Sequence, residues 1–235
     1  MSPINLKRDE ISQAEILVHN VDVSARQDSF YPVQLQTSRG RVQGRYYPVE
    51  GARLGAIWVG GAGGDWDAPA RGLYAKLCHE LASDRPLETS WGIASLWIRY
   101  RYPSQLEESV LDVLAGLTYL ESRGVEAIAL IGHSFGGAVV IQAAANALNV
   151  RTVVTLATQT FGTLPVFDLS PHCSILLLHG TEDTILPSDC SKTVYQVAQE
   201  PKRLVLYPGA NHNLDEVAPD VHLEVRSWLF EQLNS

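Results

Sequence analysis

Cysteine is scarce in this chain, with three residues irregularly spaced at positions 78, 173 and 190. A sparse, odd-numbered set argues against a disulfide framework and against a zinc site, so we expect a reducing compartment and no bound metal. Clusters of positive charge are also missing: 18 Lys and Arg stand against 26 Asp and Glu, for a net charge of −8. This composition argues against nucleic acid as a partner.

Long apolar segments are missing too. No run approaches the 18 residues that suggest a membrane-spanning helix, and residues 1–10 mix charges without the apolar centre of a signal peptide. We therefore expect no membrane partner and a cytoplasmic location. With 46% hydrophobic and 19% charged residues, the 235-residue chain suits one globular domain, in which residues 1–14 form an N-terminal arm.

Short apolar runs alternate with amphipathic segments along the chain. This alternation predicts an α/β fold, a mostly parallel central sheet with helices on both faces in three α-β-α layers. Strands are expected at 16–23, 31–36, 41–47, 55–60, 91–98, 127–131, 152–157, 174–178 and 202–207, the first three forming an antiparallel entry. Helices are expected at 68–83, 104–123, 138–148, 188–199 and 219–233.

Local signals mark the ends of two helices. Asp67 is expected to be an N-cap, with Pro69 in the first helical turn. Ser104 and Glu107 are expected to form a capping box, and Gly124 to end the same helix.

One stretch carries the clearest functional pattern. An apolar run at 127–131 leads into the pentapeptide GHSFG at 132–136, and a helix-forming segment follows. A strand that turns into a helix through G-x-S-x-G is typical of a nucleophile elbow, whose strained turn exposes the serine hydroxyl. We therefore predict that Ser134 is a nucleophile. The alternative is a glycine-rich turn in front of a packed helix.

Two further residues follow later strands of the predicted sheet. Asp183 comes after the strand at 174–178, and His212 comes after the strand at 202–207. A serine hydroxyl needs a base to remove its proton, and the imidazole needs a carboxylate to fix its tautomer. Because sites in such sheets lie at the carboxyl ends of the strands, we predict a triad of Ser134, Asp183 and His212.

Each partner has an alternative interpretation. Asp183 could be a solvated turn carboxylate. His212 could be an ordinary loop histidine, and Asp215 could be its partner instead of Asp183. His133 and His179 are interpreted as structural residues.

Together, the elbow, the loop HGTEDTILP at 179–187 and the loop GANH at 209–212 resemble those of the α/β-hydrolase superfamily. The resemblance spans about residues 16–233, and the nucleophile–acid–histidine order is that of the superfamily. The compact layout resembles the dienelactone-hydrolase-like group of small capless serine hydrolases. The namesake of that group uses Cys where this chain has Ser134, so its substrate does not carry over.

The resemblance also implies an oxyanion hole, made by the backbone N–H after the nucleophile and one from an earlier loop. Here these would be Phe135 and a residue of the loop at 60–64, with Ala62 the first choice and Gly61 the second. The small residues of this loop could otherwise mean flexibility. A phosphate loop would need G-x-x-x-x-G-K-[ST], which is absent.

The segment between the strands at 152–157 and 174–178 is too short for a helical lid, so we expect a shallow, open cleft. Trp66, Tyr100 and Phe161 are candidates for its lining, with ordinary loop packing as the alternative. Arg99 and Arg101 are interpreted as solvated loop residues, although both could favour an anionic substrate.

These observations predict a serine hydrolase of the carboxylesterase type. It would cleave carboxylic esters or related small acyl compounds through an acyl-enzyme, without a cofactor; the oligomeric state is unknown. An acyltransferase or a cofactor-free perhydrolase would use the same triad. A third alternative is a non-catalytic, ligand-binding member of the fold.

Overall fold

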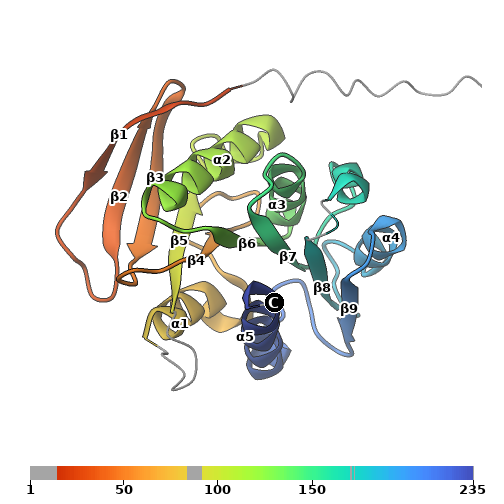
Figure 1. The fold of residues 1–235 in the computed structure, drawn as a ribbon. Coiled ribbons are helices and arrows are strands. Elements are labelled where there is room, and N and C mark those ends of the chain that lie inside the picture. Colours follow the sequence, from red (N-terminus) through yellow and green to blue (C-terminus); the bar gives the residue numbers. More distant parts are fainter. Residues whose placement is uncertain (1–14, 84–91, 170, 172, 235) are drawn as a thin grey trace, which may run out of the picture.

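A twisted sheet runs through the protein, and the computed structural model describes residues 15–83, 92–169, 171 and 173–234. The strands are β1 (Val18–Val23), β2 (Tyr31–Thr37), β3 (Gly40–Tyr47), β4 (Leu54–Val59), β5 (Ile93–Arg99), β6 (Ala127–His133), β7 (Val150–Leu156), β8 (Ser174–Gly180) and β9 (Lys202–Tyr207). Within the described residues they form one nine-stranded sheet in the order β1-β2-β3-β5-β4-β6-β7-β8-β9 (Figure 1).

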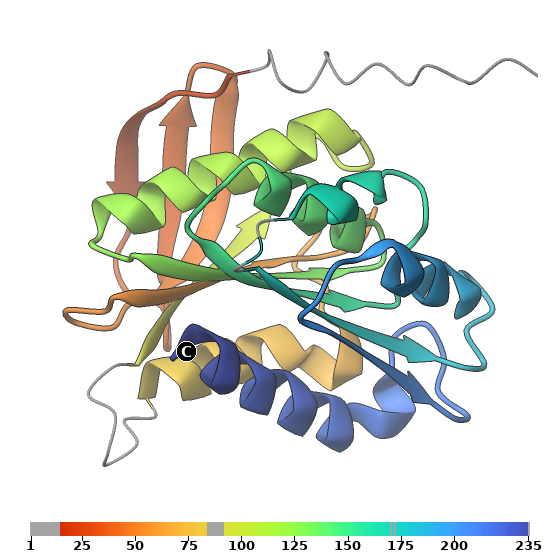
Figure 2. The same cartoon turned by 45° about the vertical axis from the view of Figure 1, so that its right-hand side comes forward.

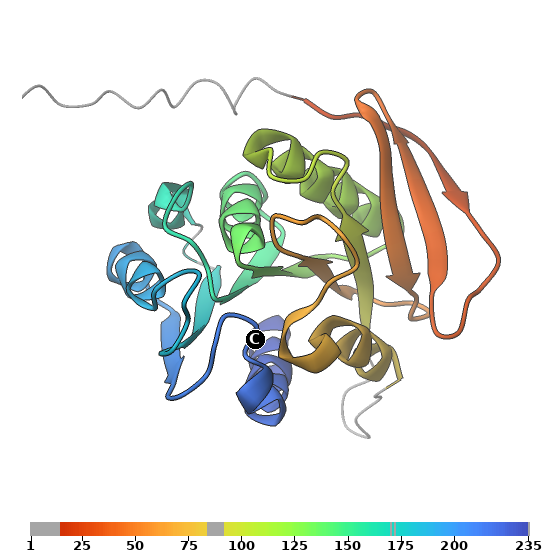
Figure 3. The ribbon, with the colours of Figure 1, turned by 180° about the vertical axis from the view of Figure 1, so that it is seen from behind.

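Strand direction divides the sheet into two parts. The strands β1, β2 and β3 pair antiparallel with one another, and β3 pairs antiparallel with β5. From β5 to β9 all pairs are parallel, so these strands end at the same edge. The antiparallel part projects from one side of the molecule (Figure 3). The predicted antiparallel entry and mostly parallel sheet are confirmed.

Helices cover both faces of the parallel part. The helices are α1 (Pro69–Ser83), α2 (Leu106–Ser122), α3 (Phe135–Ala145), α4 (Asp189–Val197) and α5 (Ala218–Leu233), with short 3₁₀ turns η2 (Leu164–Asp168) and η3 (Asp215–Val217). Figure 2 shows α1 and α5 on one face and α2, α3 and α4 on the other. Each face has its own apolar core. The three-layer prediction is therefore confirmed.

The inner strands show why the sequence folds this way. Every residue of β8 is buried, and β4, β6 and β7 each have one residue that is not. Apolar side chains on both faces of these strands are covered by helices, as expected of a parallel sheet. In β2 only Val33 and Leu35 are buried, because only one face of this strand is covered.

Several predicted helix ends need correction. The capping box is wrong, because the N-cap of α2 is Gln105 without a side-chain hydrogen bond, and the Ser104 hydroxyl donates to the Ala62 carbonyl at 3.0 Å. Gly124 does end this helix, with φ 90°. The helix after the elbow ends at Ala145 rather than at 148.

The first turn of α1 is not regular. Asp67 accepts a hydrogen bond from the Ala68 N–H at 2.9 Å, but Ala70, Arg71 and Gly72 are left-handed, with φ of 50°, 54° and 82°. The expected capped start is therefore wrong, and regular helix begins after Gly72.

Two expectations fall on residues that the structure leaves undescribed. The N-terminal arm at 1–14 and the first residue of the strand expected at 91–98 lie outside the described residues. Within the described ranges, none of the helices has the length and apolar character needed to cross a bilayer.

Candidate active site

The turn between β6 and α3 is tight and strained. Ser134 has φ 56° and ψ −119°, a conformation that a residue with a side chain rarely adopts. A Cβ on Gly132 would lie 2.2 Å from the Gly136 carbonyl oxygen, and a Cβ on Gly136 would lie 2.4 Å from that of Gly60. The predicted elbow, with glycine required at both positions, is confirmed.

Ser134 is partly exposed at the carboxyl edge of the sheet, directly before the first turn of α3. Its own N–H donates to the Leu156 carbonyl at 2.8 Å, which ties the elbow to the end of β7. The N-terminus of α3 places a partial positive charge next to this hydroxyl. The surroundings therefore favour negative charge that develops close to Ser134.

Asp183 and His212 come together at the same edge, from the loops after β8 and β9. The Nδ1 of His212 lies 2.7 Å from Oδ2 of Asp183, whose side chain is fully buried. The other oxygen, Oδ1, accepts the backbone N–H groups of Ile185 and Leu186, each at 2.8 Å. Burial alone would raise the pKa of Asp183, but these backbone donors and His212 hold it below its ordinary value. The carboxylate is thus ionised and orients the imidazole of His212.

Asp215, the alternative partner, is engaged elsewhere. Its Oδ1 accepts the Arg71 N–H at 2.7 Å, which joins η3 to the irregular start of α1. The structure therefore gives His212 the partner Asp183.

His133, directly before Ser134, contacts the loop that carries His212. Its Nε2 lies 3.1 Å from the His212 carbonyl oxygen, and the two rings lie 4.8 Å apart. Burial lowers the pKa of His133 to about 4, so the ring is neutral and donates from Nε2. His133 therefore has a specific structural role, because its contact holds His212 beside the elbow that carries Ser134.

His179, at the end of β8, contacts Asp183 directly. Its Nε2 lies 3.1 Å from Oδ2 of Asp183, and its Nδ1 lies 2.7 Å from the Ser191 hydroxyl. From the sequence alone, a histidine at a strand end indicates a structural residue. Its spacing of four residues before the predicted acid is the signal that could have pointed to this contact.

The loop after β4 approaches Ser134 through its second residue. A Cβ on Gly61 would lie 3.5 Å from the Ser134 Cβ and 3.9 Å from its Oγ. Ala62, by contrast, is exposed, and its carbonyl accepts the Ser104 hydroxyl. Phe135, the other predicted donor, is the first residue of α3. Gly61 therefore approaches Ser134 closely, and the donor from this loop, Ala62 or Gly61, stays a prediction.

The three aromatic pocket candidates lie against different parts of the protein. Tyr100 is only 4% exposed, and its hydroxyl donates to the Gly60 carbonyl at 3.2 Å, so it supports the loop after β4. The Trp66 ring packs on Arg45, at 4.3 Å from its guanidinium. Phe161, in contrast, is 77% exposed.

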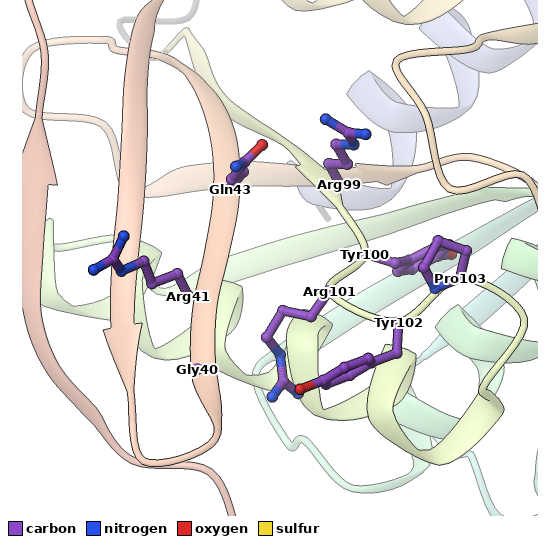
Figure 4. A pocket seen from close by; sticks show the side chains of 8 residues that line it. All are labelled: Gly40, Arg41, Gln43, Arg99, Tyr100, Arg101, Tyr102 and Pro103. Carbon is purple, nitrogen blue, oxygen red and sulfur yellow. The ribbon is translucent and has the colours of Figure 1, made fainter.

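A cavity of about 390 Å³ lies where β3 begins and β5 ends (Figure 4). Arg99 and Arg101 both line it, whereas Ser134 does not. Arg99 is 45% exposed and lies 3.8 Å from Asp65. For Arg101 the solvated interpretation is wrong, because its side chain is 4% exposed and forms a buried ion pair with Asp112.

Comparisons with known proteins agree with this fold. A family model described as the dienelactone hydrolase family matches residues 94–222. A dienelactone hydrolase from Anabaena variabilis has a TM-score of 0.73 and 17% identity, over 88% of this chain and 100% of its own. Est1E from Butyrivibrio proteoclasticus has a TM-score of 0.71 and 17% identity, over 87% and 99%. A serine hydrolase without a lid from Xanthomonas campestris has a TM-score of 0.67 and 15% identity, over 90% and 99%. No curated protein matches the chain.

Proposed function

The chain belongs to the dienelactone hydrolase family, and from this we propose that it is a serine hydrolase that cleaves carboxylic esters or related small acyl compounds. The observation that carries the proposal is the 2.7 Å hydrogen bond between His212 and a buried, ionised Asp183. The contact of His133 with the His212 backbone supports placing this pair beside Ser134.

Each residue would have one role in the first half of the reaction. The hydroxyl oxygen of Ser134 attacks the ester carbonyl carbon, and the Nε2 of His212 takes the hydroxyl proton. Asp183 holds the proton of Nδ1 in place and stabilises the imidazolium that forms. The oxyanion would accept the N–H groups of Phe135 and Gly61, where each donor is worth about 3 kcal/mol of barrier.

The second half would regenerate the enzyme. The tetrahedral intermediate collapses as the imidazolium of His212 gives its proton to the leaving alcohol, and the acyl group remains on Ser134. Water then attacks the acyl-enzyme, with His212 again as the base. The acid product leaves, and the serine hydroxyl is restored. No cofactor enters this sequence.

The segment between β7 and β8 supports a preference for small substrates. Among its described residues, 157–169, 171 and 173, the regular structure is the five-residue turn η2, and these residues offer no helical cover to a long chain. Phe161, Leu164 and Phe167 on this segment are 77%, 66% and 59% exposed. Aromatic and aliphatic side chains of this kind suit short acyl or aryl groups. Est1E, one of the similar structures, has also been solved with ferulic acid bound, so aryl esters belong in a substrate screen.

A fluorophosphonate probe tests the proposal directly. The wild-type protein should label at one site, and Ser134→Ala should abolish both labelling and ester hydrolysis while the fold is retained. Ser38→Ala, at an exposed turn before β3, is the matched control and should label fully. Labelling that persists in Ser134→Ala would refute the assignment. Hydrolysis of p-nitrophenyl esters in water, alcohol or peroxide would show which acceptor the acyl-enzyme prefers.

A further inference from the structure

Asp183 lies between two histidines that share one of its oxygens. Oδ2 receives the Nδ1 of His212 at 2.7 Å and the Nε2 of His179 at 3.1 Å. The side chains of His179 and Asp183 are both fully buried. Oδ1 accepts two backbone N–H groups, those of Ile185 and Leu186. With the two histidines on Oδ2, the carboxylate has four hydrogen-bond donors around it.

The contacts of His179 determine where its proton lies. Its Nε2 faces two acceptors, Oδ2 of Asp183 and the Leu186 carbonyl at 3.0 Å, so this nitrogen must carry hydrogen. Burial lowers the pKa of His179, so the ring is neutral and Nδ1 is bare. Nδ1 therefore accepts the hydroxyl proton of Ser191, on the first turn of α4, at 2.7 Å.

We infer that His179 is a positioning residue for the hydrolytic reaction, a second imidazole that donates to the same oxygen of the catalytic carboxylate as His212. This inference rests on the proposed function of Ser134, Asp183 and His212. The contacts form one chain, in which Ser191 donates to His179, His179 donates to Asp183, and His212 donates to the same oxygen. The two acceptors that face Nε2 fix the tautomer of His179, and Ser191 donates to the nitrogen that this tautomer leaves bare.

Two consequences follow for the reaction. The extra donor holds Oδ2 pointing at His212. It also shares the negative charge of Asp183, so that the carboxylate attracts the positive charge of an imidazolium at His212 less strongly. The other titratable groups that face the cluster are His133, whose ring contacts His212, and Asp67, whose charge acts on His133. Both remain in every variant below.

The pH profile of kcat/KM separates this role from a purely structural one. In His179→Phe the donor is lost, so the midpoint of the acid limb should move to higher pH by about 0.5–1 unit, with kcat about tenfold lower and KM little changed. His179→Gln keeps an N–H at similar reach and should restore most of the profile. A residue that only supports the fold would lower activity at every pH and leave the midpoint in place.

Two matched controls accompany these variants. Ser191→Ala leaves His179 with its two acceptors, so the midpoint should move by less than about 0.3 units. Thr155→Val alters a buried polar side chain on the neighbouring strand β7 and should change nothing. If folded His179→Phe keeps the wild-type midpoint, or moves it to lower pH, the inference is wrong.

A measurement on the resting wild-type protein covers the case in which His179→Phe does not fold. Nitrogen-15 NMR of histidine-labelled protein should show His179 neutral, with its proton on Nε2, at pH 7. A proton on Nδ1, or a charged His179, would overturn the inference. This readout needs no activity. A protein that fails to react with fluorophosphonate therefore refutes the proposed function, whereas the wrong tautomer refutes only the role of His179.

Discussion

Asp183→Asn should leave the protein folded and nearly inactive, for a reason that its hydrogen bonds make specific. The Oδ1 position accepts the N–H groups of Ile185 and Leu186, so the amide oxygen of the new side chain must occupy it. The amide NH₂ then takes the Oδ2 position and faces His212 with hydrogens. The imidazole must move its proton from Nδ1 to Nε2, which can no longer accept the proton of Ser134.

The magnitude follows from this wrong tautomer. A serine hydrolase with its base in the wrong tautomer loses about 10⁴ in kcat, or about 5.5 kcal/mol of barrier. The variant also loses the two hydrogen bonds that His212 and His179 make to the charged Oδ2. A neutral amide costs less to bury than a carboxylate, which offsets part of this loss. The free energy of unfolding should therefore fall by about 1–3 kcal/mol. Steady-state hydrolysis of p-nitrophenyl acetate and urea unfolding measure the two quantities. Raising the pH should not restore activity, because the defect is the tautomer.

Asp215→Asn is the matched control for this prediction. Asp215 carries the same carboxylate close to His212 in sequence, but it accepts the Arg71 N–H instead. It should keep wild-type kcat. If Asp183→Asn retained more than about a tenth of the activity, or if Asp215→Asn were inactive, the assignment of the acid would be refuted.

The remaining predictions concern substrate size, a buried ion pair and the elbow. Across acetyl, butyryl, octanoyl and palmitoyl esters, kcat/KM should be highest for short chains, because each methylene adds about 0.8 kcal/mol only where a surface buries it; an optimum at palmitoyl would contradict the open cleft. Arg101→Met should lower the free energy of unfolding by about 3–5 kcal/mol at pH 8, because it leaves Asp112 buried without its cation. Burial already raises the pKa of Asp112 to about 6 in spite of Arg101, so the loss should shrink at pH 5, where the carboxyl group takes up a proton; an equal loss in urea unfolding at both pH values would contradict this. Gly132→Ala should remove fluorophosphonate labelling, because its Cβ would lie 2.2 Å from the Gly136 carbonyl oxygen; a labelled variant would show that the elbow can relax.

The sequence was sufficient where one local pattern determined the outcome. Apolar runs predicted the parallel strands, and the GHSFG pentapeptide predicted the elbow, because both depend on neighbours along the chain. The pairing of Asp183 with His212 could be predicted from their places after two strands of one sheet. The contacts of His179 could not, because its partner Ser191 lies on α4 and neither residue belongs to a recognisable pattern.

The errors made from sequence have a common physical cause. Ser104 satisfied the local rule for a capping box, yet its φ is 67° and its hydroxyl joins the loop that contains Ala62. The sequence indicates a solvated loop residue at Arg101, yet this side chain is buried in an ion pair with Asp112 on α2. In both cases a contact between distant segments overrides a local preference.

Backbone strain shows where contacts between distant segments most often override local preferences. Seven residues other than glycine have positive φ in the part of the chain that the structure describes. All but Asp28 lie in the connections that follow the parallel strands β4 to β7 and β9, two of them in the irregular first turn of α1. These six are Ala70, Arg71, Ser104, Ser134, Ala157 and Leu214. Left-handed backbone at a residue with a side chain costs about 1–3 kcal/mol and persists only where the surrounding structure imposes it. Strained residues recur along one edge of the sheet, whereas the helices on both faces are regular beyond their first turns. This distribution indicates that the surrounding structure holds these connections in the geometry of the site. Sequence-based rules assume the negative φ that residues with a side chain usually adopt. Predictions of local structure from these rules are therefore least accurate where the proposed catalytic groups meet.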